Sequence, residues 1–368
     1  MSEKIVCSFC GEKLEAGESI EFKGKILCRT CFVENTVECE CCGTRIWESD
    51  SRGDDEIVLC ESCFDRNYTY CEGCNRVIHN DEAHYEDEYS EYPYCASCYE
   101  QRVKSAIKSY NYKPEPIFYG DGELYMGIEL EIDKGGENNE NADKLLNKAN
   151  RDSERIYCKH DGSICEGFEI VSHPMSLEYH LNEMNWKEIM DEAIALGYRS
   201  HQTSTCGLHI HIGRRGLSKS YDEQEQIIAR IVHFVELHWN ELLKFSRRTE
   251  ENINRWASRY GIAENTEETY YKAKNRHLGR YAAINLENTD TIEWRLFRGT
   301  LRYKSLVAAI QLVYEITRCA IMLSDREMEG LSWSEFVLKI PPDKTELIEY
   351  LKSKRLYVNE IEEEREEV

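Results

Sequence analysis

Six CxxC pairs in the first hundred residues constrain the fold of this chain more than any other feature of its sequence. Twelve of the 17 cysteines form these pairs, and the first pair recurs every 32 residues, at Cys7, Cys39 and Cys71. The second pair recurs as CRTCF, CESCF and CASCY. A fixed period is the signature of an internal repeat. The spacing therefore predicts three small modules, each built on four cysteines.

Each predicted module offers a complete set of zinc ligands. Two CxxC turns present the four thiolates of a tetrahedral structural zinc site. A module of about 30 residues needs such a metal site to fold. We expect about three zinc ions, all structural, because four thiolates leave no open coordination position. The predicted ligands are Cys7, Cys10, Cys28 and Cys31, then Cys39, Cys42, Cys60 and Cys63, then Cys71, Cys74, Cys95 and Cys98.

Other ligand choices remain open within the repeats. Cys41 stands next to Cys42 and could replace it, although the 32-residue register favours Cys39 and Cys42. His79 and His84 lie between the two cysteine pairs of the third module and could replace a cysteine there. Cysteines that bind no metal are the simplest alternative, and six pairs in register argue against it.

The charge and amino-acid composition of the chain limit which binding partners and which cellular compartment we expect. Acidic residues outnumber basic ones by 69 to 46, and the formal charge of −23 repels polyanions, so we expect no nucleic-acid partner. The sequence has no run of 18 apolar residues and no signal-like N-terminal segment, so we expect no membrane insertion and no secretion. CxxC pairs that bind metal are typical of a reducing compartment. We therefore expect a cytoplasmic protein.

The sequence KPEP, which holds two of the six prolines, indicates a boundary after a short predicted helix at 99–109. The predicted domains are three zinc modules at 1–35, 36–67 and 68–112, and one larger α+β domain at 113–368. Apolar residues at three- and four-residue spacing predict helices at 177–196, 221–245 and 304–323 in that domain.

Five segments of the larger domain alternate as strands do, at 123–133, 167–172, 207–213, 281–287 and 291–297. Their polar sets include Glu129, Glu131, Asp133, Glu169, His209, His211, Asn285, Glu293 and Arg295. If the strands share one sheet, four glutamates crowd together, which is costly unless cations neutralise them. Carboxylates with imidazoles suit Mg²⁺ or Mn²⁺, and the arginines would then meet phosphate. Alternation alone does not make these strands neighbours, so a merely solvated face remains the alternative.

The same residues resemble a known family. The motifs are GIELE at Gly127, DGS at Asp161, GFEIVSHP at Gly167, CGLHIHIG at Cys206, RYAAINL at Arg280 and TIEWRLFRGT at Thr291. In this order and spacing they resemble the amidoligase family, which is similar in fold to glutamine synthetase and glutamate–cysteine ligase. The resemblance implies an antiparallel sheet of the glutamine synthetase-like type, with helices packed on one face.

The resemblance also implies roles for single residues. Divalent ions would be held by Glu129, Glu131, Glu169, His209 and Glu293, and nucleotide phosphates would be contacted by His211 and Arg295, with Arg280 and Arg298 as weaker candidates. Glu129, Glu293 and Arg295 would be catalytic, and Asp161 and Ser163 of the DGS motif would lie near the substrate. Glu166 could compete with Glu169 as a ligand, although its offset of three residues places it on the opposite face of a continuous strand.

The implied reaction is the ATP-dependent joining of a carboxylate to an amine through an acyl phosphate. The chain contains no GxxxxGK[ST] loop and no GxSxG elbow, so phosphate binding would depend on metal ions and arginines. The zinc modules would recruit a protein or peptide partner. Two other functions are compatible with the sequence: a non-catalytic interaction protein with an inactive ligase-like scaffold, and a metal-dependent hydrolase suggested by the HxH strand.

Overall fold

The computed structural model describes residues 5–15, 17–85, 91–201, 203, 205–276 and 278–357. The chain forms two compact units, Met1–Ser105 and Ala106–Val368. The second unit begins before the boundary predicted after residue 112, because strand β11 (Ile107–Lys108) pairs in parallel with β13 (Ile156–Lys159) and so joins the large sheet.

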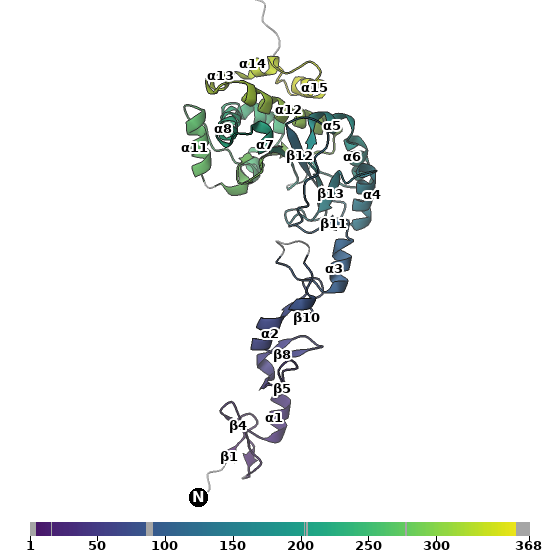
Figure 1. Ribbon diagram of the computed structural model, residues 1–368, viewed down its shortest axis with the longest axis vertical. Coiled ribbons are helices and arrows are strands. Elements are labelled where there is room, and N and C mark those ends of the chain that lie inside the picture. Colours follow the sequence, from purple (N-terminus) through teal and green to yellow (C-terminus); the bar gives the residue numbers. More distant parts are fainter. Residues whose placement is uncertain are drawn as a thin grey trace, which may run out of the picture. The chain divides into compact units, whose positions relative to one another are not determined.

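The first unit consists of short hairpins and short helices (Figure 1). Its elements are β1 (Ile5–Val6), β2 (Lys13–Leu14), β3 (Ile20–Phe22), β4 (Lys25–Leu27), α1 (Arg29–Asn35), β5 (Thr36–Glu38), β6 (Arg45–Trp47), η1 (Glu48–Asp50), β7 (Ser51–Gly53), β8 (Val58–Cys60), α2 (Glu61–Asn67), β9 (Tyr68–Tyr70), β10 (Val77–His79), η2 (Asn80–Glu82) and α3 (Ala96–Val103).

The first CxxC pair of each module lies in a tight turn that the sequence repeats in register. The residue after its second cysteine is Gly11, Gly43 or Asn75, and each adopts the left-handed conformation, with φ of 73°, 70° and 58°. The amide of each donates to the carbonyl of the first cysteine of its pair. Glycine and asparagine adopt this conformation at the lowest cost, so the turn chemistry follows the cysteine period.

The second CxxC pair begins a helix. Cys28 is the N-cap of α1, and its sulfur accepts a hydrogen bond from the amide of Cys31 over 3.4 Å. Cys60 is the N-cap of α2 in the second module. The turn and the helix start therefore place two pairs of thiols opposite each other in each module.

The three four-cysteine clusters have the dimensions that zinc requires. Sγ–Sγ distances between the two pairs are 3.8 Å for Cys10–Cys28, 3.9 Å for Cys42–Cys60 and 3.9 Å for Cys74–Cys95. Tetrahedral Zn–S bonds of about 2.3 Å place neighbouring sulfurs roughly 3.8 Å apart. The clusters contain the twelve predicted cysteines, and Cys41 belongs to none of those described.

One cation supports the thiolate state directly. Arg76 donates its Nε–H to Cys74 Sγ over 3.5 Å, and this hydrogen bond lowers the pKa of the Cys74 thiol to about 6. Because zinc binds the deprotonated sulfur, a lower thiol pKa favours loading of the third module at neutral pH.

The second unit is a mixed α+β domain around one eight-stranded sheet. The strand order is β11–β13–β14–β12–β16–β18–β17, with β15 paired to β12, and every pairing except β11 with β13 is antiparallel. The strands not yet given are β12 (Tyr125–Ile132), β14 (Phe168–Ser172), β15 (Met175–Ser176), β16 (Gly207–Gly213), β17 (Ile284–Asn285) and β18 (Thr291–Arg298). The mixed class predicted from the sequence is confirmed.

The helices of the second unit pack around this sheet and against one another (Figure 1). They are α4 (Asn139–Ala149), α5 (Leu177–Asn182), α6 (Trp186–Ala195), α7 (Arg214–Leu217), α8 (Tyr221–Leu237), α9 (Trp239–Ser246), α10 (Glu250–Trp256), α11 (Thr266–Asn275), η3 (Gly279–Tyr281), α12 (Tyr303–Met322), α13 (Asp325–Glu329), α14 (Trp333–Leu338) and α15 (Thr345–Ser353). Alternate strand residues such as Ile128, Ile210 and Trp294 are fully buried against them.

Two of the three predicted helices are interrupted. The segment 177–196 forms α5 and α6, because the chain turns so that the indole of Trp186 donates to His180 over 3.2 Å. The segment 221–245 divides into α8 and α9 at His238, which leaves helical geometry and contacts the carbonyl of Leu331 at 2.8 Å. In both cases a buried polar contact outweighs helix continuity.

Helix α12 is the one helix among the described residues that is long and apolar enough to span a membrane. Its apolar window is 72% buried inside the protein, as in the central helix of a globular domain.

The clusters predict three zinc ions per chain. Elemental analysis of the purified protein should give about three zinc ions, and Cys39→Ser should lower the content by one and loosen only its own module. Removal of zinc by a chelator should unfold the first unit, because such small modules cannot bury enough core to fold without metal. Circular dichroism and limited proteolysis measure this loss.

Cys41→Ser is the matched control, because it removes a neighbouring thiol that is not one of the four ligands assigned to the second module. It should retain full zinc content. Full zinc retention after Cys39→Ser, or a first unit that keeps its structure without zinc, would contradict the four-thiolate assignment.

Candidate functional site

The antiparallel register brings the predicted polar residues of five strands onto one face of the sheet. Glu131 of β12 lies opposite Glu169 of β14, and Glu129 of β12 lies opposite His209 of β16. His211 of β16 lies opposite Glu293 of β18, which in turn lies opposite Asn285 of β17. The strands are neighbours and their polar sets are aligned, so these residues form one continuous cluster, named here the carboxylate face.

Histidines separate the carboxylates at the centre of this face. His209 Nδ1 lies 3.2 Å from Glu129 Oε2 and 3.5 Å from Glu293 Oε1, and its Nε2 lies 3.8 Å from Glu131 Oε1. His211 Nε2 lies 3.2 Å from Glu129 Oε1. Glu129 is therefore the carboxylate that both imidazoles contact.

Two ligand triads meet at Glu129. One consists of Glu129, Glu169 and His209, the other of Glu129, His211 and Glu293, and the ligand atoms of each lie within 4.8 Å of one another. Two carboxylates with one imidazole suit a hard divalent cation such as Mg²⁺ or Mn²⁺. Three protein ligands also leave coordination positions for substrate oxygens. The donor sets fit two divalent ions with Glu129 between them.

The electrostatics divide the glutamates into two groups. Burial would raise the pKa of Glu129 and of Glu293, but the neighbouring histidines outweigh it and hold both pKa values below the usual range. Burial raises the pKa of Glu131, and burial together with the charge of Glu129 raises the pKa of Glu169 well above its usual value. Without metal, ionisation of the two carboxyl groups at the Glu131–Glu169 end of the face is therefore unfavourable.

Lys159 partly neutralises that end, and it was not among the residues predicted from the sequence. Its Nζ lies 3.3 Å from Glu169 Oε2, opposite Glu169 in the register of β13 and β14. Burial would lower the pKa of Lys159, but Glu169 and Glu129 outweigh it and raise the pKa. The sequence does contain a signal for Lys159, because Tyr157 and Lys159 alternate with the buried Ile156 and Cys158. That strand has only four residues.

A β-bulge positions the arginines of β18. Leu208 pairs with Phe297 and Ile210 pairs with Trp294, so Arg295 and Leu296 together lie opposite His209. The guanidinium of Arg295 hydrogen-bonds Glu293, and its Nε is buried without a hydrogen-bond partner among the described residues. The extra residue also shifts the alternation of side chains in β18. Arg298 therefore lies opposite Gly207, which is on the same face of β16 as His209. This explains why Arg298 departs from the simple period.

The DGS motif forms a local turn beside the face. Asp161 Oδ1 accepts hydrogen bonds from the amide of Ser163 over 2.7 Å and from its hydroxyl over 2.5 Å. The charge of Asp161 contributes to the raised pKa values of Glu131 and Glu169, after the effect of burial. The turn therefore presents Asp161 toward the acidic end of the cluster.

Glu166 and Glu169 occupy different environments. Glu169 is 3% exposed within the carboxylate face. Glu166 is exposed and lies 3.6 Å from the ammonium of Lys134. The geometry therefore favours Glu169 over Glu166 as a metal ligand.

Arg280 and Arg248 lie in different environments with respect to the carboxylate face. Arg280 is exposed, and its guanidinium donates to the hydroxyls of Tyr110 and Tyr281. Arg248 was not predicted. Burial lowers its pKa to about 10, while Glu131 acts in the opposite direction and Arg295 adds to the lowering. A Cβ on Gly207 would lie 2.7 Å from Arg248 Nη2, so the glycine makes room for this guanidinium.

Comparison with known proteins gives one family. A family model described as "Putative amidoligase enzyme" matches residues 129–317, just over half of the 368-residue chain. Among solved structures, a bifunctional glutathione synthetase from Pasteurella multocida is similar at a TM-score of 0.35 and 12% identity. That match covers 63% of this chain and 46% of the synthetase chain. No curated protein matches the chain.

The unfavourable ionisation at the Glu131–Glu169 end of the face predicts opposite effects for two substitutions. In zinc-loaded protein free of Mg²⁺ and Mn²⁺, Glu131→Gln should raise the melting temperature by roughly 2–4 °C, or about 1 kcal/mol, because it removes a buried charge and keeps an acceptor for Gly207. Lys159→Met should lower stability by about 1–3 kcal/mol, because it leaves Glu169 unpaired. Thermal unfolding with and without Mn²⁺ measures both.

Added Mn²⁺ should stabilise the wild type and Lys159→Met, and stabilise Glu131→Gln less. A Glu131→Gln protein that is less stable than wild type without metal would mean that Glu131 is already neutralised by its surroundings.

Proposed function

The chain belongs to the amidoligase family, and on this premise we propose that it joins a carboxylate to an amine in an ATP-dependent reaction that passes through an acyl phosphate. The observation that carries the proposal is the pair of ligand triads that share Glu129, with the guanidinium of Arg295 bound to Glu293 beside them. A face that concentrates carboxylates, imidazoles and arginine fits a polyphosphate bound through divalent cations.

Each residue of the face has a role in this proposal. Glu129, Glu131, Glu169, His209 and Glu293 hold divalent ions, and Glu131 also lies close to His209 at the acidic end. Bound Mg²⁺ or Mn²⁺ would supply neutralisation of the triphosphate charge. His211 and Arg295 contact phosphate oxygens, and the second triad also offers His211 as a metal ligand. The Nε of Arg295 has no hydrogen-bond partner among the described residues and is a donor available for phosphate. Asp161 and Ser163 contact the substrate near the acidic end.

The reaction balances without a covalent enzyme intermediate. A carboxylate oxygen of the acid attacks the γ-phosphorus of ATP, the bond to the β-phosphate oxygen breaks, and ADP leaves. The amine nitrogen then attacks the acyl carbon, the bond between that carbon and the phosphate oxygen breaks, and phosphate leaves as the amide forms. The nitrogen gives up one proton, which the leaving phosphate or solvent accepts. Arg295 stabilises the charge on the transferring phosphoryl group, and the sheet holds both reactants in line.

We also propose that the sheet is of the glutamine synthetase-like type. A largely antiparallel sheet with ligands on one face and helices on the other supports this assignment. A period of two separates the two faces along β12 and β16, and the bulge in β18 shifts it by one residue.

The zinc modules serve, in this proposal, to recruit a protein or peptide substrate. Exposed apolar side chains on the first module support a recruiting role: Val33 is 64% exposed, Val6 is 47% exposed and Phe9 is 45% exposed. We place the protein in the cytoplasm, where thiolate clusters remain reduced.

Loss of the shared carboxylate should abolish the reaction. With ATP, Mg²⁺ and panels of acids and amines, the wild type should release ADP and phosphate together with an amide product. Glu129→Gln should lower kcat by about 10³-fold or more, since both triads lose a ligand, and Arg295→Lys by roughly 10²-fold, the loss expected for one transition-state donor. Coupled ADP release and mass spectrometry of the product measure these effects.

Glu166→Gln is the matched control, because it makes the same substitution at an exposed position outside the triads. It should retain full activity. Turnover without ATP would indicate a hydrolase, and a folded wild type that does not bind ATP with Mn²⁺ would exclude the ligase.

Deletion of residues 1–105 tests the recruiting role. The shortened chain should bind ATP with Mn²⁺ as the full chain does, because the carboxylate face lies wholly within the second unit. It should lose affinity for the partner that the full chain captures. Undiminished partner binding after deletion would exclude the modules as the recruiting element.

A further inference from the structure

The second zinc module differs from the other two by a fifth cysteine. Cys41 stands between Cys39 and Cys42, two of the four ligands assigned to that module. At the same step of the 32-residue repeat, the first module has Phe9 and the third has Gly73. One module of the three therefore carries a thiol that a tetrahedral metal site does not require.

The third module shows where a side chain at this step of the repeat lies. A Cβ on Gly73 would lie 2.8 Å from the Cβ of Cys98 and 2.9 Å from its Sγ. Cys98 is the fourth ligand of the third module, and Cys63 is its counterpart in the second. The geometry of the repeat therefore directs the side chain of Cys41 toward Cys63.

Interactions within the second module agree with this placement. Hydrogen bonding to Cys60 and then to Cys41 raises the pKa of the Cys63 thiol. Burial, followed by the charge of Cys41 and a hydrogen bond with it, raises the pKa of the Tyr68 hydroxyl. Cys41 therefore lies beside both Cys63 and Tyr68, at the edge of the four-thiol cluster.

Cys41 and Cys63 are within reach of a disulfide bond. Bonded cysteines have Cβ atoms roughly 3.5–4.5 Å apart. At the equivalent positions of the third module, a Cβ on Gly73 would be even closer than this to the Cβ of Cys98. A small outward displacement of the turn that carries Cys41 is therefore enough to give bonding geometry, and no large movement of the chain is needed.

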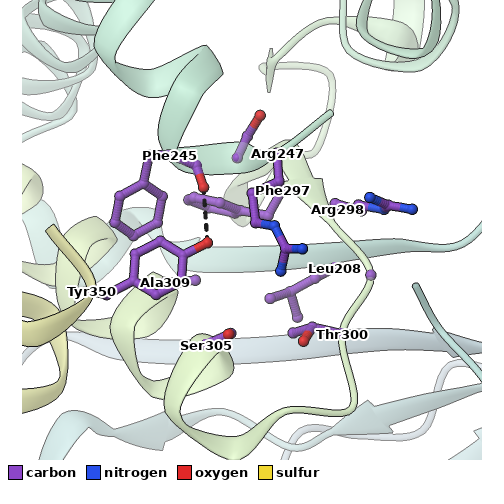
Figure 2. Close-up of a pocket in the computed structure, with 11 residues that line it drawn as sticks. Leu208, Phe245, Arg247, Phe297, Arg298, Thr300, Ser305, Ala309 and Tyr350 are labelled. Atoms are coloured by element: carbon purple, nitrogen blue, oxygen red, sulfur yellow. Dashed lines mark hydrogen bonds between the residues drawn. The ribbon is translucent and has the colours of Figure 1, made fainter. Parts of the chain in front are cut away.

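Exposure makes this pair accessible from solution. Cys41 is exposed and Cys63 is partly exposed. In the second unit, three of the four cysteines are buried and Cys165 is exposed. None of the eleven described residues that line the pocket of that unit shown in Figure 2 is a cysteine. Cys41 therefore combines exposure with a neighbouring thiol, and Cys165 provides an exposed cysteine for comparison.

We propose that Cys41 and Cys63 form an oxidisable pair, so that a peroxide converts the second module from a zinc site into a disulfide. The inference stands on the four-thiolate sites of the first unit and does not rest on the ligase reaction. In a reducing compartment, disulfides are usually transient and regulatory. A reversible change in one zinc module fits such a role.

The reaction balances with hydrogen peroxide as the oxidant. The sulfur of Cys41 attacks one peroxide oxygen and the O–O bond breaks. A sulfenic acid forms, and the second oxygen leaves as water with the thiol proton. The Cys63 thiolate then attacks the sulfenic sulfur, the S–O bond breaks, and hydroxide leaves as the disulfide forms. The two sulfurs together give up two electrons, which reduce the peroxide.

Formation of the disulfide removes one ligand from the zinc site. Cys63 no longer offers a thiolate, so three of the four assigned ligands remain and the affinity of the second module for zinc falls. The first and third modules keep all four ligands, because neither has a cysteine at the step of Cys41. Oxidation should therefore loosen the second module alone, and a thiol reductant should restore it.

Zinc release from the full-length zinc-loaded protein tests the proposal. With limiting hydrogen peroxide and a zinc-binding indicator dye, the wild type should release about one zinc ion per chain in a fast phase. The remaining zinc should follow at least about tenfold more slowly, because a thiol already held beside Cys63 reacts at a high effective concentration. Mass spectrometry should identify a Cys41–Cys63 disulfide after the fast phase. Dithiothreitol with added zinc should reverse the loss.

Three variants locate the effect. Cys41→Ser should keep its full zinc content before oxidation and lose the fast phase. Cys165→Ser is the matched control, because it removes an exposed cysteine from the second unit, and it should release zinc as the wild type does. Phe9→Cys, made in the Cys41→Ser protein, places the thiol at the same step of the first module. It should restore a fast phase, with a disulfide from position 9 to Cys31.

Several results would overturn the proposal. Equal release rates for the wild type and Cys41→Ser would do so, as would a disulfide between Cys41 and a ligand other than Cys63. Loss of zinc from Cys41→Ser before oxidation would make Cys41 a ligand and reject its role as a fifth thiol. A transplanted thiol that gives no fast phase would reject the geometry of the repeat as the cause. Because no readout depends on ATP or on an amide product, failure of the ligase function leaves this test intact.

Discussion

Repulsion among four glutamates on one buried sheet face is the interaction to which the rest of the second unit is adapted. Glu131, Glu169 and Glu293 are each 5% exposed or less, so water screens them poorly. The antiparallel register makes the crowding unavoidable, because it aligns the polar set of every long strand. Imidazoles, one lysine and one arginine offset part of the charge, and divalent cations are the remaining means of offsetting it.

Local patterns in the sequence predicted which residues form this face. Long-range pairing of the strands determined which of those residues lie next to one another. Alternation identified Glu129, Glu131, His209 and Glu293 because a strand has a period of two whatever it pairs with. Lys159 was missed because β13 is too short to show a period, and Arg248 because it follows a helix end without a motif. The proximity of Lys159 and Arg248 to the face follows only from the pairing of β13 with β14 and the packing of α9 against β18.

Elsewhere, contacts distant in sequence changed the local prediction. Helical periodicity was correct for the 303–322 region, where helix α12 is buried along its length. It failed at His238, where a hydrogen bond to a carbonyl far along the chain interrupts an otherwise continuous pattern. In the first unit the agreement is closer, because metal ligands and left-handed turn residues recur together at the same 32-residue period. Chemistry that is local in sequence is what a single sequence predicts best.

The bulge at Arg295 and Leu296 has a consequence for comparing this protein with its relatives. One additional residue reverses the facing of every side chain that follows it in the strand, so Glu293 and Arg298 share a side although five positions separate them. A relative with the same strand sequence but no bulge would present its equivalent of Phe297 where this chain presents Arg298. Two family members with the same residues at the end of this strand can therefore differ in which chemical groups reach the substrate. Equivalent residues must be identified from superposed structures rather than from a sequence alignment.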